Sequence, residues 1–441
     1  MTGVSVFPET SFPAQQGSWV GKAVRHQTDG DRNFAGKHTV PASPPNAVPH
    51  FFFGRRRATE GNRLEVIYGG SAFFDRYIQL LDSARYFVFI QVYILQDDET
   101  GQMIRQALLR AASRGVKVHL YADAYGSRPL PDSFIQALRS AGIEFRFFGP
   151  LRDGRRLHLG RRMHHKVLVV DGRQALVSGR NLSDSYNDLP GKPAWLDFAV
   201  QAEGPVVAQL LRICLQKWFR KRMKKIPPPY TLQPEAPVAG VGCMAEAREN
   251  DALLRKQQVS ASYLGAIRMA QKEILIVGGY FLPGSIARYR LKKATRQGVR
   301  VAVLTGRQSD IGLVKYARRY LYQWMLREGI EMYEYRETVV HGKVLVADES
   351  WCSLGSYDLN NLSAYSNIEL NLDFYDPAGV KKLRDYLCEK MERESDRVTP
   401  EFLHRVSGRF HGPVLWFSYY LVRILFRVSQ LLAVSNKQTR E

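Results

Sequence analysis

The sequence contains one short arrangement twice, as MHHKVLVVDG at residues 163–172 and as VHGKVLVAD at residues 340–348. Each copy places a His and a Lys two residues apart, followed by an apolar run and an Asp. Side chains at i and i+2 of a strand point to the same face, so His164 and Lys166 should project together. The corresponding pair of the second copy should do the same. Each copy therefore predicts a strand that presents a His-Lys pair.

The Asp that closes each copy has a different predicted role. The apolar runs at 167–170 and 344–347 are typical of buried strands. Asp171 and Asp348 follow these runs, at the parity opposite to that of the Lys and near the strand end. Asp171 also precedes a Gly, and that dipeptide is typical of turns. We interpret the His and Lys as the chemical pair and the Asp as a structural anchor.

The duplication extends well beyond these two strands. Residues 83–95 (SARYFVFIQVYIL) resemble residues 270–282 (AQKEILIVGGYFL), and both runs favour a strand. Two further matches, each indicating a helix, a Gly stop and a strand, pair 107–123 with 290–306 and 137–149 with 324–336. Helices that alternate with single strands predict an α/β sheet in each half of the chain.

Composition divides the chain into five predicted segments. Its 441 residues leave room for two or three domains, and an apolar fraction of 45% supports a sizeable core. The segments are a disordered basic and Pro-rich lead at 1–57, a first α/β domain at 58–226, a Pro-rich linker at 227–245, a second α/β domain at 246–400 and a tail at 401–441.

The charge balance predicts an anionic partner. Lys and Arg outnumber Asp and Glu by 63 to 42, a net charge of +21, which suits nucleic acid, an acidic membrane surface or a phosphorylated substrate. The first fifty residues contain no apolar core typical of a signal peptide. The four cysteines form no CxxC pair and no zinc spacing, so reduced thiols in a cytosol-facing protein are the simplest interpretation.

Two His-Lys pairs around one cavity would suit a phosphodiester. One His can attack phosphorus while the other protonates the leaving alkoxide and then deprotonates the incoming alcohol or water. The two Lys ammonium groups would stabilise charge on the non-bridging oxygens. The sequence has no metal-ligand spacing, and the prediction is that no metal or other cofactor is needed.

The paired motifs resemble the HxKxxxxD signatures of the phospholipase D superfamily, over about residues 60–400. The resemblance implies two tandem α/β domains related by pseudo-twofold symmetry, with the active site at their interface. It implies a phosphohistidine on His164 as nucleophile and a general acid/base role for His341. The implied catalytic set consists of His164, Lys166, Asp171, His341, Lys343 and Asp348.

The resemblance also implies supporting residues. Asn181, in SGRN, would hydrogen-bond the phosphate. Asp197, in WLDFAVQAEGPVV, would orient the first His, His164, and Glu369, in SNIELN, would orient the second His, His341.

The second half departs from the family pattern at one place. Where the family usually reads GSxNLD, this chain reads GSYDLN, so Asp358 takes the Asn position and Asn360 the Asp position. An ionised Asp358 would repel a phosphodiester. It could turn away, hold a proton or pair with a neighbouring cation, and all three alternatives stay open. Asp358→Asn is expected to be tolerated because it restores the usual residue.

Two segments favour a lipid substrate over nucleic acid. Residues 217–225 (KWFRKRMKK) combine six basic residues with Trp218 and Phe219, a composition that suits an anionic leaflet, although a solvated basic helix face is the alternative. Residues 413–434 form an apolar stretch interrupted by Arg423 and Arg427. We predict an interfacial helix with these arginines, in one stripe with Tyr419 and Gln430, toward headgroups. A helix docked on the body and a true span are the alternatives.

MHHKVLVVDG and LDFAVQAEGPVV resemble the bacterial cardiolipin synthase branch of the superfamily more than its nucleases. That resemblance implies transfer of a phosphatidyl group from phosphatidylglycerol to the hydroxyl of another phospholipid. It also implies a peripheral enzyme at the cytoplasmic face of the bacterial membrane. A phospholipase D or nuclease that admits water is the alternative enzyme, and a membrane-binding scaffold without catalysis is the alternative outside enzymes.

Overall fold

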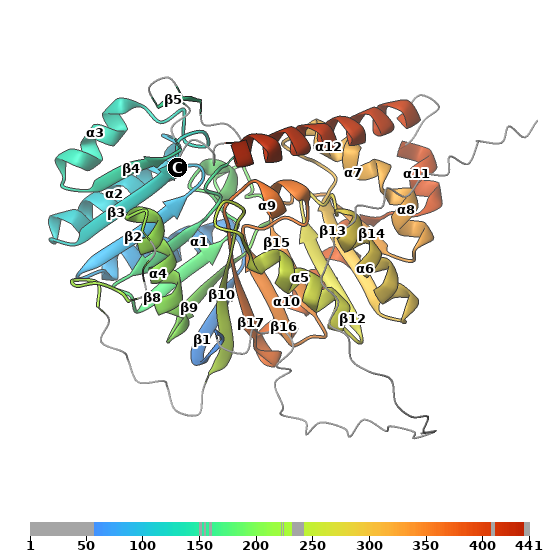
Figure 1. The fold of residues 1–441 in the computed structure, drawn as a ribbon, viewed down its shortest axis with the longest axis horizontal. Helices are drawn as coiled ribbons and strands as arrows, with labels where there is room; N and C mark the ends of the chain where they lie inside the picture. Colours follow the sequence, from blue (N-terminus) through green and yellow to red (C-terminus); the bar gives the residue numbers. More distant parts are fainter. Residues whose placement is uncertain are drawn as a thin grey trace, which may run out of the picture. The chain divides into compact units, whose positions relative to one another are not determined.

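Two copies of one strand pattern join in a single mixed sheet (Figure 1). The computed structural model describes residues 57–149, 152–153, 156–157, 161–221, 223, 225–231, 242–406 and 411–435. All of these lie in one compact unit, residues 48–441. The predicted lead at 1–57 lies outside the described residues except for its last position, as does most of the predicted linker. The predicted domain bounds therefore stay a prediction.

The first half contributes seven strands to the sheet. In spatial order from the centre outward they are β1 (Thr59–Ile67), β9 (Ala199–Glu203), β8 (Gln174–Ser178), β7 (Val167–Val170), β2 (Phe87–Val92), β3 (Lys117–Asp123) and β4 (Glu144–Phe148). β2, β3 and β4 run parallel, whereas the others pair antiparallel. A separate short hairpin joins β5 (Arg152–Asp153) and β6 (Arg156–Leu157).

The second half repeats this order on the other side of the centre. From the centre outward its strands are β10 (Cys243–Asp251), β17 (Glu369–Tyr375), β16 (Trp351–Gly355), β15 (Lys343–Ala347), β12 (Glu273–Gly278), β13 (Arg300–Gly306), β14 (Glu331–Tyr335) and β18 (Ser395–Arg397). β11 (Lys256–Gln257) pairs with β10. β1 and β10 pair antiparallel, and the mirrored order on either side matches the predicted pseudo-twofold relation. The predicted fold class is confirmed.

Helices cover both faces of the sheet. Those of the first half are α1 (Gly70–Ser83), α2 (Glu99–Ser113), α3 (Asp132–Ser140) and α4 (Val206–Trp218), with a 3-10 turn at Asp184–Tyr186. Those of the second half are α5 (Gln258–Met269), α6 (Ser285–Arg296), α7 (Gly312–Tyr320), α8 (Tyr322–Arg327), α9 (Asn361–Tyr365), α10 (Pro377–Arg393), α11 (Pro400–Val406) and α12 (His411–Ser435). Gly115 and Gly298, the two predicted helix stops, have φ of 83° and 86°, a conformation that only glycine adopts without cost.

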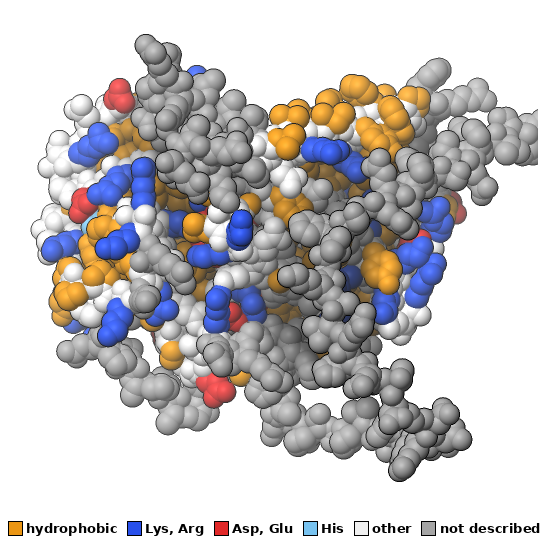
Figure 2. Space-filling view, in the orientation of Figure 1, with side chains coloured by type: hydrophobic (Ala, Val, Ile, Leu, Met, Phe, Trp, Pro, Cys, Tyr) orange, Lys and Arg blue, Asp and Glu red, His pale blue; other side chains and the backbone are white. Residues whose placement is uncertain are grey.

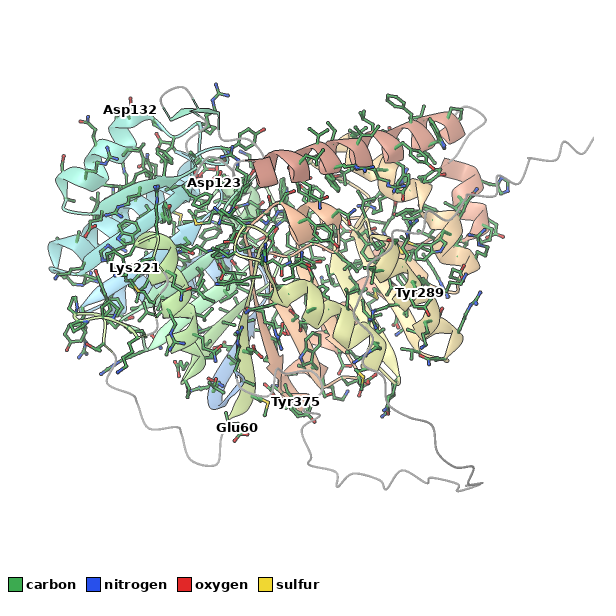
Figure 3. The ribbon with its side chains drawn as sticks, in the orientation of Figure 1. Glu60, Asp123, Asp132, Lys221, Tyr289 and Tyr375 are labelled. Carbon is green, nitrogen blue, oxygen red and sulfur yellow. The ribbon has the colours of Figure 1, made fainter. Side chains whose placement is uncertain are left out.

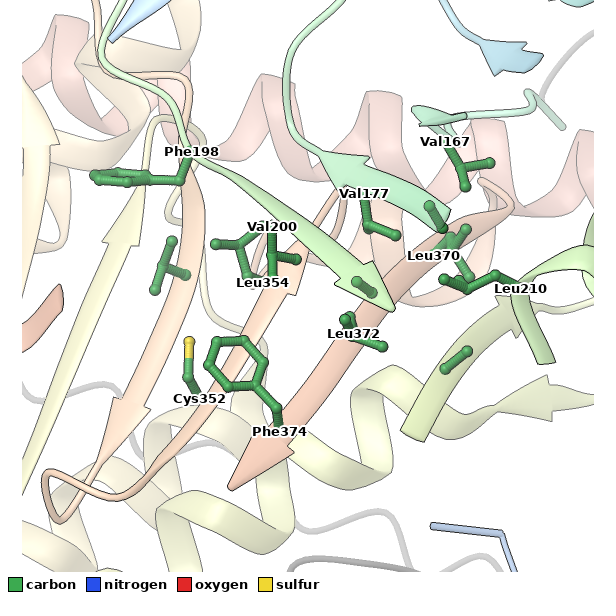
Figure 4. Packing of buried hydrophobic residues seen from close by; sticks show 14 of the residues in the cluster. Val167, Val177, Phe198, Val200, Leu210, Cys352, Leu354, Leu370, Leu372 and Phe374 are labelled. Atoms are coloured by element: carbon green, nitrogen blue, oxygen red, sulfur yellow. The ribbon is translucent and has the colours of Figure 1, made fainter. Parts of the chain in front are cut away.

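The core follows the two-residue period of the strands. Val167 and Val169 of β7 face a hydrophobic cluster shared by both halves, whereas Leu168 and Val170 face the cluster under α1, α2 and α3. The shared cluster joins Phe198, just before β9, and Val200 of β9 with residues of β16 and β17 (Figure 4). Because side chains from both halves fill this one cluster, packing holds the halves together, and it places the starts of β7 and β15 near each other.

Candidate active site

The two motif histidines stand just before β7 and β15, where each chain segment is tied to the opposite half. The backbone N–H of His164 donates to the Ile368 carbonyl at 2.9 Å, and the N–H of His341 donates to the Leu196 carbonyl at 2.9 Å. Ile368 directly precedes β17, and Leu196 lies shortly before β9. The segment that leads into β9 of the first half thus pairs with the second motif, and the segment that leads into β17 of the second half pairs with the first motif.

This cross-pairing decides which carboxylate meets which histidine. Nδ1 of His164 lies 2.9 Å from Oε2 of Glu369, and Nδ1 of His341 lies 2.7 Å from Oδ2 of Asp197. The predicted pairing, Asp197 with His164 and Glu369 with His341, is therefore wrong. The prediction placed each carboxylate with its own half, whereas the backbone bridges carry Asp197 and Glu369 across the interface. Each half completes the site of the other.

Burial and the paired carboxylates set the protonation of both rings. Burial lowers the pKa of His164, and it lowers the pKa of His341 to about 4. Burial would raise the pKa of Asp197 and Glu369, but the hydrogen bond and the charge of the paired histidine hold both below the usual value. The resting site thus contains two neutral imidazoles, each beside an ionised carboxylate. With Nδ1–H donating to the carboxylate, Nε2 of each ring carries the free lone pair.

Both motif lysines are buried and folded back on their own motif. Nζ of Lys166 donates to the His164 carbonyl at 3.0 Å, and Nζ of Lys343 donates to the His341 carbonyl. Burial lowers the pKa of Lys166 to about 7, although Glu369 opposes the shift. His164 and Lys166 both lie against the Tyr93 ring, and His341 and Lys343 both lie against the Tyr280 ring, in agreement with the prediction that His and Lys of each motif project together.

Two tyrosines cover the lysines, and the sequence analysis missed them as site residues. The ammonium of Lys166 lies 5.1 Å from the ring centroid of Tyr93, and that of Lys343 lies 5.5 Å from the ring centroid of Tyr280. These are cation–π distances. Tyr93 and Tyr280 occupy the same position of the repeat, in QVYIL and GGYFL. The tyrosine repeated in both halves was the signal in the sequence that could have identified them.

Both halves of the chain match one family of known proteins. Residues 77–191 and 263–391 match the family described as "Cardiolipin synthase, PLD-like domain". Cardiolipin synthase B of Salmonella typhi is 33% identical over 339 residues, covering 74% of this chain and 80% of that protein. Cardiolipin synthase A of Pseudomonas putida KT2440 is 32% identical over 373 residues, covering 82% and 76%. The chain belongs to the cardiolipin synthase family of phospholipase D-like proteins.

A solved structure carries the same fold. Phosphatidylserine synthase of Haemophilus influenzae superposes with a TM-score of 0.65, over 84% of this chain and 94% of that one, at 13% identity. At that identity the likeness shows the fold alone. The predicted resemblance to the phospholipase D superfamily is confirmed by the family match.

Two members of the family signature lie away from the reacting side chains. The Asp171 carboxylate accepts hydrogen bonds from the backbone N–H groups of Arg85, Tyr86 and Phe87, each at 2.8 Å. Asp348 accepts in the same way from residues 271–273 at the start of β12. Each Asp therefore ties the far end of its motif strand to the neighbouring strand. The catalytic role implied by the family signature is wrong for both, and the structural role inferred from their parity is confirmed.

Asn181 is held by its surroundings. Its side-chain oxygen accepts from the Ile94 N–H at 3.1 Å, and its amide nitrogen donates to the Tyr186 hydroxyl at 2.8 Å. Asn360 caps α9, accepting from the Ser363 N–H at 2.9 Å, and also donates to the Tyr280 carbonyl at 3.0 Å. Asn360 thus organises the loop beside the site.

Asp358 pairs with a cation, the third of the alternatives left open by the sequence. Its Oδ2 lies 3.3 Å from Nζ of Lys343, and its Oδ1 lies 3.4 Å from the Tyr280 N–H. Burial raises the pKa of Asp358, and the charge of Lys343 opposes that shift. A carboxylate therefore stands in the second half where the first half has an amide.

Arg180 is a further buried cation that the sequence analysis did not single out. Its guanidinium donates to the Asp197 carbonyl and lies 5.3 Å from the Phe73 ring centroid. Its charge is among the causes that hold the pKa of Asp197 low. Within the described part of the chain, no group of three or more His, Cys, Asp or Glu side chains converges in a way that could hold a metal ion.

Part of the predicted membrane segment 217–225 is buried. Lys217 forms ion pairs with Glu249 and, at 2.6 Å, with Asp251. Trp218 is only 2% exposed and lies under Arg146, at 4.1 Å from guanidinium carbon to ring centroid. For Lys217 and Trp218 the membrane prediction is therefore wrong, because the acidic residues of β10 and the aromatic core beside β3 take up both side chains.

The rest of that segment stays at the surface. Phe219 is 43% exposed, and Arg220, Lys221 and Lys225 are also exposed. Lys221 lies on the first half, well below α12 in the view of Figure 3. A membrane role for these residues stays a prediction.

The C-terminal apolar segment forms α12, which is docked on the second half. It packs on α7 and α9, and the rings of Tyr419 and Tyr320 stack at 4.7 Å between centroids. Tyr419 and Val422 are buried, so the prediction that Tyr419 faces headgroups is wrong. Arg423 and Arg427 are exposed. No described helix is both long and apolar enough to cross a membrane.

The outer face of α12 is rich in large apolar side chains. Trp416, Phe417 and Ile424 are 52%, 58% and 58% exposed. Figure 2 shows this face as a band of hydrophobic side chains with arginine between them. Further members of the band are Val414, Tyr420, Leu425, Val428 and Leu431. α9 follows directly after Asn360, so α12 lies beside the site end of the second half.

Proposed function

We propose that this protein is a phosphatidyltransferase of the cardiolipin synthase type. It transfers a phosphatidyl group from phosphatidylglycerol to the hydroxyl of a second phospholipid. The observation that carries the proposal is the pair of imidazoles, each held at Nδ1 by a carboxylate of the opposite half. Membership of the family and the names of its cardiolipin synthase relatives support the choice of lipid over other phosphodiesters.

The reaction proceeds in two displacements. In the first, Nε2 of His164 attacks phosphorus, the bond from phosphorus to the headgroup oxygen breaks, and His341 gives its proton to the leaving glycerol. In the second, His341 takes the proton from the hydroxyl of the acceptor lipid, whose oxygen attacks phosphorus as the bond to His164 breaks. The family resemblance supports His164 as the nucleophile. The ammonium groups of Lys166 and Lys343 stabilise negative charge on the phosphoryl oxygens.

Binding of the anionic substrate favours uptake of a proton from solvent by His341, and the first step needs that proton. The pKa of His341 is about 4 in the resting site, where the imidazole is neutral. A monoanionic phosphodiester beside the ring favours the charged form and raises that pKa. Asp197 then stabilises the imidazolium that forms. Protonation of the acid is thus coupled to the arrival of the anionic lipid.

The outer face of α12 binds the membrane. Its occupant is an anionic phospholipid bilayer, because the substrate resides there and because the chain carries a net charge of +21. Exposed Trp and Tyr side chains beside arginines suit the boundary between headgroups and acyl chains. The contact is peripheral and lies at the cytoplasmic face of the bacterial membrane. α12 then holds the site end of the second half against the lipid surface.

The test is to incubate the purified full chain with phosphatidylglycerol vesicles and to identify the products. Cardiolipin together with glycerol is the expected result. Phosphatidic acid with glycerol would instead identify a hydrolase, in which water replaces the acceptor lipid. Absence of turnover in the wild type would contradict both and favour a membrane-binding scaffold. His164→Ala is the matched negative control because it removes the nucleophile from an otherwise equal surface.

A further inference from the structure

The lysines of the two motifs have different neighbours. Lys343 is 1% exposed and Asp358 is 3% exposed, and their charged groups lie 3.3 Å apart. Lys166 makes no such contact with a carboxylate among the described residues. Its neighbours are the His164 carbonyl and the Tyr93 ring. The second lysine is therefore paired with a carboxylate by contact, whereas the first lacks such a contact and has N–H donors left for an anion.

The difference arises at equivalent positions of the repeat. Asn181 follows β8 as Asp358 follows β16, and each has a side-chain oxygen near a backbone N–H at the end of the equivalent strand, that of Ile94 or that of Tyr280. The other end of the side chain differs. The Asn181 amide donates to Tyr186, whereas Asp358 presents a second oxygen that faces Lys343. Exchange of one nitrogen for oxygen thus changes a donor into an acceptor.

Asp358 has acceptor capacity to spare. A carboxylate can accept about four hydrogen bonds, and the contacts of Asp358 with Lys343 and with the Tyr280 N–H use only part of that capacity. A phosphoryl oxygen has no hydrogen to donate, and its charge would be repelled. A hydroxyl group donates a hydrogen bond and carries no charge. Asp358 therefore suits an alcohol rather than the phosphate.

We propose that Asp358 is a specificity-determining residue that makes the second half-site the alcohol side of the reaction. Lys166 holds the phosphoryl oxygens, while Asp358 accepts a hydrogen bond from a second hydroxyl of the leaving or entering alcohol. The ligand class is a polyol such as the glycerol headgroup. The assignment rests on the proposed phosphatidyl transfer, and it places the polyol in the same half as His341, the acid/base.

The experiment measures acceptor choice by the full chain. Wild type and Asp358→Asn receive phosphatidylglycerol with equal concentrations of 1,3-propanediol and 1-propanol, and the two phosphatidyl alcohols are quantified. The two alcohols differ in the second hydroxyl. We expect wild type to favour the diol by about tenfold or more, as for a hydrogen bond to a charged group. In Asp358→Asn the ratio should fall to the statistical value, which is set by the two equivalent hydroxyls of the diol against the single hydroxyl of propanol.

Two outcomes would overturn the assignment. A wild-type ratio near the statistical value would do so without any variant, and an equal preference in both proteins would do so even if both fold normally. If neither protein forms any phosphatidyl alcohol or cardiolipin, the proposed function itself is wrong, which is a distinct result. Asp310→Asn is the matched control, since it removes an exposed carboxylate that binds the Tyr280 hydroxyl without touching Lys343. It should keep the wild-type ratio.

A second measurement separates this role from a structural one. In Asp358→Asn the Lys343 ammonium loses its counter-ion and becomes available to anions. Inhibition by inorganic phosphate should therefore tighten by about tenfold, while the melting temperature falls because the buried ammonium loses its charged partner. A side chain with only a packing role would leave phosphate inhibition unchanged or weaker. That second pattern would overturn the assignment.

Discussion

The two half-sites share one scaffold and differ in charge. In the first half Lys166 lies under Tyr93, in the second half Lys343 lies under Tyr280, and each lysine donates to the carbonyl of its own motif histidine. Of these two lysines, Lys343 alone contacts a carboxylate within the described part of the chain, that of Asp358. The duplicated fold thus supplies two equivalent sets of reactive groups, and one substitution makes the charges around the two lysines differ.

The largest effects are expected from the histidines themselves. His164→Ala and His341→Ala should each lower turnover by about 10⁴-fold, because each ring has a part that the other cannot perform. The two variants should differ in a trapping experiment with lipid labelled in the phosphatidyl group. Acid-labile label should accumulate on His341→Ala and stay absent from His164→Ala. Label on residue 341 of the His164→Ala protein would reverse the assignment of nucleophile and acid.

The next largest effects are expected from the two carboxylates that pair with the histidine of the opposite half. Asp197→Asn should behave as a defect of His341, and Glu369→Gln as a defect of His164, each with turnover lower by about 10³-fold because the histidine loses its orienting charge. Trapping distinguishes them, since label should accumulate in Asp197→Asn but not in Glu369→Gln. The opposite pattern would mean that each carboxylate serves the histidine of its own half.

The charge difference can be erased by the converse substitution. Asn181→Asp places a carboxylate at the position of the first half that Asp358 occupies in the second. Pairing would give Lys166 the carboxylate contact that it lacks among the described residues, so kcat/KM should fall by about 100-fold. The melting temperature serves as control for folding. A kcat/KM within threefold of the wild type would show that Lys166 does not carry the phosphoryl charge.

The pH profile tests the same lysine. Its pKa is lowered to about 7, and an ammonium is charged below its pKa, so anion binding is complete at lower pH and lost as pH rises through about 7. We expect kcat/KM to fall by about tenfold per pH unit on the alkaline side. Lys166→Arg should remove the part of this fall that is centred near pH 7, because a guanidinium stays charged, while the dependence on protonated His341 stays. The same change at Lys343 should leave the limb in place, and a limb that moves only with Lys343 would contradict the comparison.

The smallest effects are expected from α12, which only the second half carries. Replacement of Trp416, Phe417 and Leu425 by Ser on its exposed face should weaken binding to anionic vesicles by about tenfold, with little loss of activity on short-chain lipid in detergent. Tyr419→Ala, on the docked face, should instead lower the free energy of unfolding by about 3 kcal/mol. Sedimentation with vesicles and thermal melting measure the two effects. A change of oligomeric state in the triple variant would indicate that a second copy, rather than lipid, covers this face.

Local pattern in the sequence determined most of the scaffold. The alternation of helices and strands, the Gly stops at 115 and 298 and the buried motif strands follow from periodicity and backbone preference, which act over a few residues. The parity of Asp171 and Asp348 predicted their anchoring role correctly, because position along a strand is enough to decide which way a side chain points. The repeat itself made the two His-Lys pairs visible.

Contacts between distant segments decided the rest. Asp197 meets His341, and Glu369 meets His164, because backbone bridges at Leu196 and Ile368 cross the interface, and no local pattern in the sequence encodes a crossing. The sequence predicts Lys217 as part of a basic surface segment, whereas in the structure Glu249 and Asp251 of β10 form ion pairs with it. An apolar helix such as α12 offers several faces, and only its packing on α7 and α9 determined which one stays exposed. Such choices depend on partners far along the chain, so tertiary structure alone settles them.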